Sequence, residues 1–227
     1  MKRKYKLIII ILISAVFTYL IYFFNKEDKL NIVALGDGIA SGQTSYNIDG
    51  ISFNDYIKEY YDNKKLLNNY DSKYAYKNYK ISELIHDLRS NDLKVDEELY
   101  VKQIIHKANI ITICFGEEEL VKLSITKDLD TDYLRKFINE YDHLLYMLKE
   151  ITDAKIVIVG FYENKYLDKS KVIILNSEIS NIAIKHESLF INIGDLLLNK
   201  EYYLDNNSYY FNYKGHKTIA EMIIHSV

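Results

Sequence analysis

Short apolar runs that end at a glycine constrain the fold of this chain more than any other feature of its sequence. Continuous apolar runs are typical of strands buried on both faces of a parallel sheet, because a strand that faces water on one side alternates apolar with polar residues. A fourth apolar run spans residues 189–193. The other three runs are 31–35, 110–115 and 155–159, and each is followed by a glycine: Gly36, Gly116 and Gly160.

Segments with helical periodicity separate these runs. Ile81, Leu84, Ile85 and Leu88 recur at the spacing of one helix face. By contrast, residues 62–80 are rich in tyrosine, asparagine and lysine, and we predict that they are irregular. The alternation of strands with helices indicates an α/β fold with a parallel sheet covered on both faces. Further helices are predicted at 53–60, 132–151, 171–185 and 215–224, and another helix is predicted to end at Ile104 and Ile105, before the second strand.

The functional site of such a sheet lies beyond the carboxyl ends of its strands. In this chain those ends carry Gly36-Asp37-Gly38, Gly116-Glu117-Glu118-Glu119 and Gly160. No internal repeat and no second domain boundary interrupts the pattern, so residues 31–227 are expected to form one domain. A chain of 227 residues is long enough for one ordinary domain and an additional segment.

The first 30 residues predict a membrane anchor. Residues 1–6 form a tail with four basic side chains, 7–24 are apolar apart from two hydroxyl residues and two tyrosines, and 25–30 form a short polar stalk. An apolar helix of this length nearly crosses a ~30 Å hydrocarbon layer. A cleaved signal peptide is the alternative, but the run ends in bulky aromatic residues rather than in the small residues of a cleavage site. No cysteine follows that would carry a lipid.

Charge indicates the orientation of this helix and the class of partner. The aromatic end of the run suits a membrane–water interface and favours a retained, single-pass anchor, and the basic residues before it favour a cytoplasmic N-terminus. On either interpretation the rest of the chain is extracytoplasmic. The net charge of the chain is −3, and without the four basic residues of the tail it is −7. An acidic domain without a basic stripe argues against a nucleic-acid partner. The single cysteine, Cys114, excludes a disulfide framework and a cysteine-based metal site.

Several sequence blocks resemble the motifs of the SGNH/GDSL hydrolase family. Residues 34–42, ALGDGIASG, resemble the first block, G-D-S-[LI]-[AS]-x-G. Residues 114–120 resemble the block G-x-N-D, and residues 210–220 resemble H-P-N-x-x-G-[HY]-x-x-[IL]-A. Residues 78–83 occupy the place of N-x-G-x-S-G. The resemblance implies a three-layer α/β/α, flavodoxin-like fold, hydrolysis of acyl or acetyl esters, and neither a metal nor an organic cofactor.

The residues that perform the chemistry of this family are substituted at every matched position. A glycine at the nucleophile position cannot form an acyl-enzyme. A carboxylate in the oxyanion hole opposes the developing negative charge, and a tyrosine with a pKa of about 10 is a poor base at neutral pH. The nucleophile position holds Gly38, and the positions of the oxyanion glycine and the oxyanion asparagine hold Glu83 and Glu118. The acid position holds Asn207 (or Ser208), and the base position holds Tyr210.

Other polar residues near these blocks remain candidates for function. Ser41, one helical turn beyond Gly38, is a candidate for a relocated nucleophile with His216 as its base; helix capping and a structural role are the alternatives. Asp37 is expected to hold its loop by accepting backbone N–H bonds. The further candidate binding residues are Glu117, Glu119 and Asn212.

The acidic run 117–119 has two interpretations. It is either a solvated loop, or its side chains turn inward. In the second case Asp37, Glu83 and Glu118 would converge on a site for a hard cation such as Ca²⁺.

Two classes of function are consistent with these residues. The first is a membrane-anchored, extracytoplasmic SGNH-like protein that does not use the family's mechanism and binds a cell-envelope glycan, a lipid headgroup or a protein. The second is an acyl or acetyl esterase that uses a relocated nucleophile, Ser41, with His216. The first is preferred because Gly38, Glu118 and Tyr210 cannot perform the roles of the family residues that they replace, each for a separate chemical reason.

Overall fold

The computed structural model describes most of the predicted domain. The predicted basic tail, nearly all of the anchor at 7–24 and the matched position Asn207 (or Ser208) lie outside the described residues. Within the part of the chain that is described, no helix is long and apolar enough to cross a membrane. The described residues are 14, 16–17, 29–44, 46, 48–90, 101–125, 131–163, 169–194, 200–203 and 210–227.

A five-stranded parallel sheet forms the centre of the domain, in the order β2-β1-β3-β4-β5. This is the flavodoxin-like strand order, so the predicted α/β fold with a parallel sheet is confirmed. The apolar runs of the sequence become the inner strands, and β1, β3 and β4 are buried over nearly their whole length. The strands are β1 (Leu30–Gly36), β2 (Leu67–Ala75), β3 (Ile110–Cys114), β4 (Lys155–Val159) and β5 (Leu189–Ile191).

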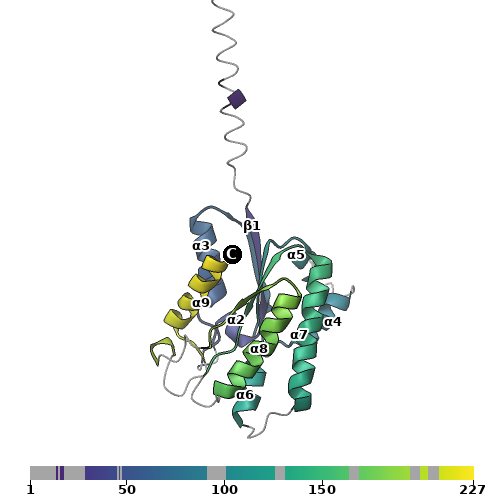
Figure 1. The fold of residues 1–227 in the computed structure, drawn as a ribbon. Coiled ribbons are helices and arrows are strands. Elements are labelled where there is room, and N and C mark those ends of the chain that lie inside the picture. Colours follow the sequence, from purple (N-terminus) through teal and green to yellow (C-terminus); the bar gives the residue numbers. More distant parts are fainter. Residues whose placement is uncertain are drawn as a thin grey trace, which may run out of the picture.

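Helices cover both faces of this sheet (Figure 1). β2 lies on one side of β1 and the remaining strands lie on the other, so right-handed crossovers bring the connecting helices to opposite faces. One face carries α3 (Phe53–Asn63) and α9 (Tyr213–Ser226). The other face carries α4 (Ile81–Arg89), α5 (Val101–His106), α7 (Thr131–Ile151) and α8 (Lys169–Lys185). At the carboxyl ends of the strands lie α2 (Gly38–Ser41) and α6 (Glu117–Ile125).

The prediction that residues 62–80 are irregular is wrong, because they contain β2. This strand lies at the edge of the sheet, and apart from the buried Ala75 its residues are exposed or half-buried. Its partly buried side chains, Tyr70 and Tyr74, pack against the core, and asparagine, serine and lysine take exposed positions. Backbone pairing with β1 supplies the hydrogen bonds that make it a strand. The local amino-acid composition of residues 62–80 does not reveal this pairing, so it could not be predicted from them.

A buried polar network ties α3 to the sheet. The Asn54 side chain is 1% exposed and donates to the carbonyl of Ala40 at 3.0 Å. Its Oδ1 atom accepts a hydrogen bond of 2.6 Å from the hydroxyl of Thr112 on β3. The network therefore joins α3, α2 and β3 directly below the carboxyl edge of the sheet, and it satisfies polar groups that cannot reach water.

Replacing Asn54 tests the contribution of this network. We expect Asn54→Ala to lower the free energy of unfolding by about 2–3 kcal/mol, because it leaves the Thr112 hydroxyl and the Ala40 carbonyl buried without their partner. Chemical denaturation followed by circular dichroism measures the change. Asn63→Ala, at an exposed position of the same helix, is the matched control and should cost less than about 1 kcal/mol. Equal costs for the two variants would contradict this assignment.

Candidate functional site at the carboxyl edge of the sheet

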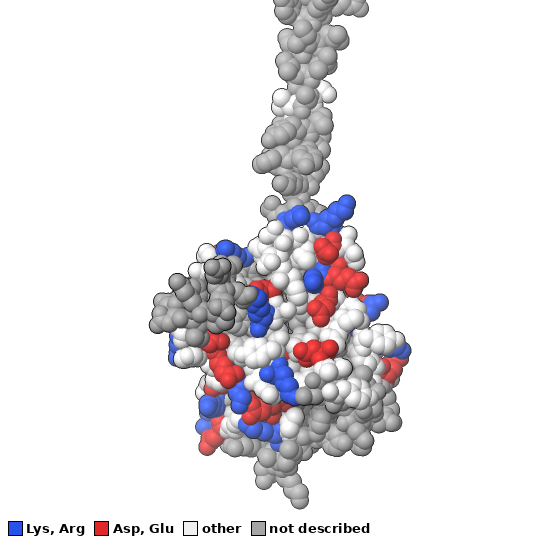
Figure 2. Space-filling model, turned by 180° about the vertical axis from the view of Figure 1, so that it is seen from behind, with Lys and Arg blue, Asp and Glu red and all other residues white. Residues whose placement is uncertain are grey.

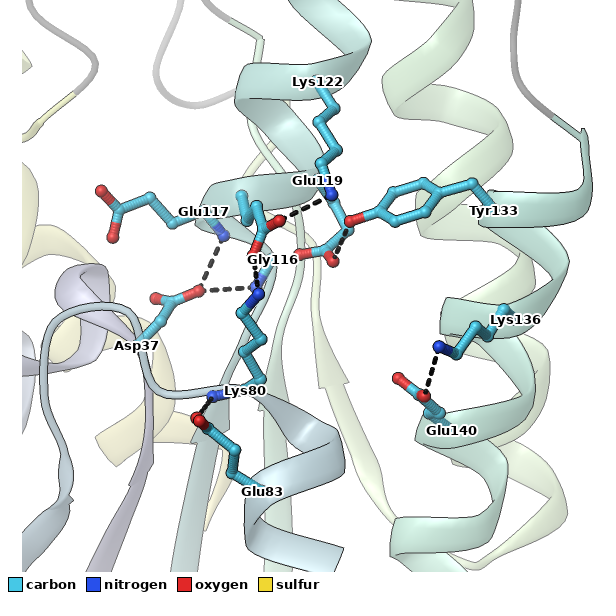
Figure 3. A network of polar contacts seen from close by, with 11 residues as sticks. Asp37, Lys80, Glu83, Gly116, Glu117, Glu119, Lys122, Tyr133, Lys136 and Glu140 are labelled. Carbon is cyan, nitrogen blue, oxygen red and sulfur yellow. Dashed lines mark hydrogen bonds and ion pairs between the residues drawn. The ribbon is translucent and has the colours of Figure 1, made fainter.

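Asp37 holds the carboxyl edge of the sheet together. It follows β1 directly, is only 4% exposed, and caps α2 by accepting a hydrogen bond from the backbone N–H of Ile39 at 3.1 Å. Its other carboxylate oxygen accepts hydrogen bonds of 2.7 Å from the backbone N–H groups of Gly116 and Glu117, where α6 begins (Figure 3). One carboxylate thus joins the loop after β1 to the loop after β3, in the loop-holding role that the sequence suggested for it.

Burial and a neighbouring charge shift the titration of this carboxylate. Burial and, to a smaller extent, the charge of Glu117 raise the pKa of Asp37, and three backbone N–H groups lower it, so that its net pKa is about 7. Asp37 therefore titrates within the physiological range.

The place of the family's nucleophile is filled by other side chains. A Cβ atom added to Gly38 would lie 2.3 Å from Oε1 of Gln43 and 2.4 Å from Oε2 of Glu117, and real Cβ atoms essentially never come this close to another atom. Among the described residues neither of these two oxygens has a hydrogen-bond partner. The glycine therefore does more than remove a hydroxyl, because a serine at this position would require the ends of the Gln43 and Glu117 side chains to move.

Tyr210, the residue at the position of the histidine base, is bonded to the same glutamate. Its hydroxyl donates a hydrogen bond to Oε1 of Glu117. Burial and this carboxylate raise the pKa of Tyr210 above its usual range. The tyrosine therefore acts as a hydrogen-bond donor that fixes Glu117 over Gly38, and its chemistry at neutral pH is not that of a base.

The acidic run 117–119 forms the first turn of α6 rather than a loop, and its carboxylates do not converge with Glu83. Glu83 accepts a hydrogen bond of 2.9 Å from the backbone N–H of Lys80 at the start of α4. Glu118 makes ion pairs with Lys80 at 2.8 Å and Lys122 at 2.6 Å. Hydrogen bonds from these lysines lower the pKa of Glu118.

These contacts leave no cation site of the kind considered above. Within the described ranges, no group of three or more His, Cys, Asp or Glu side chains could hold a metal ion. The carboxylates of Asp37, Glu83 and Glu118 are each bound to separate partners instead: backbone N–H groups for the first two and lysines for the third.

A cleft of about 590 Å³ opens beside Asp37, where α4, α6 and α7 meet. Glu119 lies in it, and its carboxylate accepts a hydrogen bond of 2.7 Å from the hydroxyl of Tyr133 on α7 (Figure 3). Burial raises the pKa of Glu119. The other charged side chains that line the cleft are Asp37, Lys80, Glu117, Glu118, Lys122, Lys136 and Glu140.

Ser41 and His216 are engaged in separate contacts. The Ser41 hydroxyl donates to the carbonyl of Gly38 at 3.1 Å and approaches a carboxylate oxygen of Asp49 at 3.4 Å. His216 is 3% exposed, and its Nδ1 atom accepts a hydrogen bond of 3.2 Å from the backbone N–H of Phe53. Burial lowers the pKa of His216 to about 4. The structure thus gives each residue a local partner and does not join the two by a hydrogen bond.

Asn212 lies at the start of α9, away from the cleft lining. Its Oδ1 atom accepts hydrogen bonds from the backbone N–H groups of Lys214 and Gly215, and its amide donates to the carbonyls of Glu201 and Tyr203. Asn212 therefore caps the helix and holds the preceding loop.

Sequence reasoning did not identify Gln43, nor the lysines that pair with Glu118. Gln43 lies five residues beyond Gly38, outside the matched block, and nothing in its surroundings in the sequence marks it as a contact of that glycine. Of the two lysines, the position of Lys122 in the sequence could have indicated its ion pair with Glu118. Lys122 follows Glu118 by four residues, a spacing that pairs side chains on a helix.

The titration of Asp37 predicts a pH-dependent stability. The raised pKa means that the folded state keeps a proton that the unfolded chain loses near pH 4, so stability falls as the pH rises from 4 through 7. Asp37→Asn removes this titration. Between pH 5 and pH 8 we expect the free energy of unfolding of the unmodified protein to fall by on the order of 2 kcal/mol more than that of the variant. Urea denaturation at the two pH values measures the difference, and parallel changes would show that Asp37 does not titrate in this range.

Comparisons with known proteins identify the fold. No family model matches the chain, and no curated protein matches its sequence. Solved structures do match it. A lipase/acylhydrolase from Enterococcus faecalis is 12% identical, with a TM-score of 0.61 over 86% of this chain and 93% of that one. An acetylxylan esterase from Geobacillus stearothermophilus is 14% identical, with a TM-score of 0.64 over 88% and 95% of the two chains.

A third structure, a lipase from a goat rumen metagenome, is 16% identical, with a TM-score of 0.62 over 87% of this chain and 97% of that one. Each match spans nearly the whole of the other protein, at a sequence identity that establishes the fold and leaves the activity open. The resemblance that the sequence blocks indicated is therefore confirmed at the level of structure: the chain has the fold of the SGNH/GDSL-type hydrolases.

Proposed function

We propose that this chain is a membrane-anchored, extracytoplasmic protein that uses the SGNH/GDSL hydrolase fold to bind a ligand and does not hydrolyse esters by the family's mechanism. The observation that carries the proposal is the space above Gly38, which the side chains of Gln43 and Glu117 fill. A hydrolase of this fold needs a serine hydroxyl and an approaching substrate carbonyl at that point. The ligand is a glycan, a lipid headgroup or a protein.

The other matched positions support the same interpretation. Tyr210 donates a hydrogen bond where the family places its base, and Glu118, at the position of the oxyanion asparagine, is a carboxylate paired with two lysines. A negative charge there would raise the energy of an oxyanion. Both Tyr210 and Glu118 thus have partners within the domain, as expected for residues that stabilise a fold.

The surface offers no support for a nucleic-acid partner. On the face seen in Figure 2, acidic and basic side chains intermingle and do not form an extended basic stripe. Nucleic-acid binding needs clustered positive charge, and the chain as a whole is acidic. The cleft beside Asp37 is of the size of a small-molecule site and is the natural place for the ligand.

Gly38→Ser tests whether the nucleophile position is filled. We expect the variant to remain inactive on p-nitrophenyl acetate and to lose about 1–2 kcal/mol of stability, because the new Cβ displaces Glu117 from its hydrogen bond with Tyr210. In a Glu117→Ala background, which removes one of the two close contacts, the same substitution should cost less. Chemical denaturation of the four proteins in this cycle measures the coupling. An equal cost in both backgrounds would mean that Glu117 does not occupy the position.

A fluorophosphonate probe for serine hydrolases tests the absence of an activated serine. We expect no stoichiometric adduct on the full chain, since the Ser41 hydroxyl donates to the backbone carbonyl of Gly38 and its other contact is the carboxylate of Asp49 at 3.4 Å, with no hydrogen bond to His216 in the described structure. Mass mapping of the treated protein locates any adduct, and an active serine hydrolase in the same reaction serves as the positive control. Stoichiometric labelling of Ser41 that is lost in Ser41→Ala would overturn the proposal in favour of a relocated active site.

A further inference from the structure

The parallel sheet gives the domain two chemically different ends. All five strands run in the same direction, so their amino ends form one edge and their carboxyl ends form the opposite edge. Leu30, the first residue of β1, lies at the amino edge, and the described chain reaches it directly from Lys29. Asp37, Gly116 and the cleft lie at the carboxyl edge. In Figure 1 the amino edge is at the top of the domain and α6 is at the bottom.

The C-terminus also lies at the amino edge. Lys155, the first residue of β4, donates a hydrogen bond of 2.8 Å to the terminal residue, Val227. Both ends of the domain therefore lie opposite the cleft, as the positions of β1 and the C label in Figure 1 illustrate.

The chain between the predicted anchor and β1 is too short to invert the domain. Residues 25–29 separate the apolar run 7–24 from Leu30, and five residues reach at most about 18 Å when fully extended. The seven residues of β1 alone span about 23 Å from the amino edge to the carboxyl edge. To bring the carboxyl edge to the membrane, the connecting chain would have to run back along the outside of the domain, over a path longer than its own reach.

We infer that the amino edge of the sheet faces the membrane that anchors the chain, and that the cleft takes a polar ligand from the aqueous side rather than a headgroup of that membrane's own lipids. The inference rests on the proposed anchoring by residues 7–24. It narrows the proposed function, because a lipid headgroup of the same bilayer is removed from the three classes of ligand.

The lining of the cleft agrees with a ligand that arrives through water. Its accessible side chains are mainly carboxylates and lysines from α6, α7 and the start of α4, with Tyr133 and Val121 half-buried among them, whereas Tyr79 and Phe137 are buried. An acyl chain would need an apolar channel. A cleft of about 590 Å³ suits a small polar molecule or a segment of a polymer.

Site-specific fluorescence on the full chain in vesicles tests this orientation. Single cysteines are introduced at the exposed positions Lys107 and Asp153 of the amino edge, and at Lys136 and Tyr213 near the carboxyl edge. The native Cys114 is buried and its pKa is raised well above its usual value, so it stays unreactive in the folded protein. The unmodified protein is the control for background labelling. The thiols are coupled to a small fluorophore, and the vesicles contain a lipid with a nitroxide on its headgroup.

We expect the nitroxide lipid to quench the labels at Lys107→Cys and Asp153→Cys at least about twofold more than those at Lys136→Cys and Tyr213→Cys, because the two edges are ~23 Å apart. Equal or stronger quenching at the carboxyl edge, in protein that floats with the vesicles, would overturn the orientation and leave the anchor intact. A chain that does not float with vesicles would overturn the anchor and, with it, this inference. Circular dichroism of each labelled variant checks that it is folded.

Discussion

The arrangement of the site depends on the buried carboxylate of Asp37. Removing a charge from water is costly, and three backbone N–H groups offset part of that cost by donating to its two oxygens. Because these donors belong to the loops after β1 and β3, the carboxylate fixes the distance between the two loops. That distance in turn sets where α6 begins, and so brings Glu117 over Gly38.

The substitutions at the matched positions act together rather than singly. Glu117 fills the space of a serine side chain, and Tyr210 holds it there by a hydrogen bond. Glu118 is neutralised by Lys80 and Lys122, which line the same cleft. A hydrolytic site keeps its polar groups available for a substrate, whereas these groups are satisfied mostly within the protein. The cleft beside them is formed where α4, α6 and α7 meet at the edge of the sheet, and this combination supports the proposed binding function.

The direction of the sheet has a consequence for the whole chain. In a parallel sheet the chain enters at the amino edge, and the site lies at the carboxyl edge, which is the opposite edge. With the proposed anchor joined to β1 by a short stalk, the cleft would lie at a distance from the bilayer of roughly the length of a strand, about 23 Å. An anchored chain of this kind would present its site outward, toward molecules that reach it through water.

The sequence by itself determined the inner strands and most helices, because continuous apolar runs and 3.6-residue periodicity report burial directly: β4 begins and ends where its apolar run does, at Lys155 and Val159. It also identified Gly38 as a position without a nucleophile. Only the tertiary structure decided that β2 is a strand, because its backbone hydrogen bonds come from β1, which is distant in sequence. Likewise only the structure decided that Gln43 and Glu117 fill the space over Gly38, and that Glu83 and Glu118 face separate partners. These contacts depend on the directions of side chains where several loops meet, and a local sequence pattern does not determine those directions.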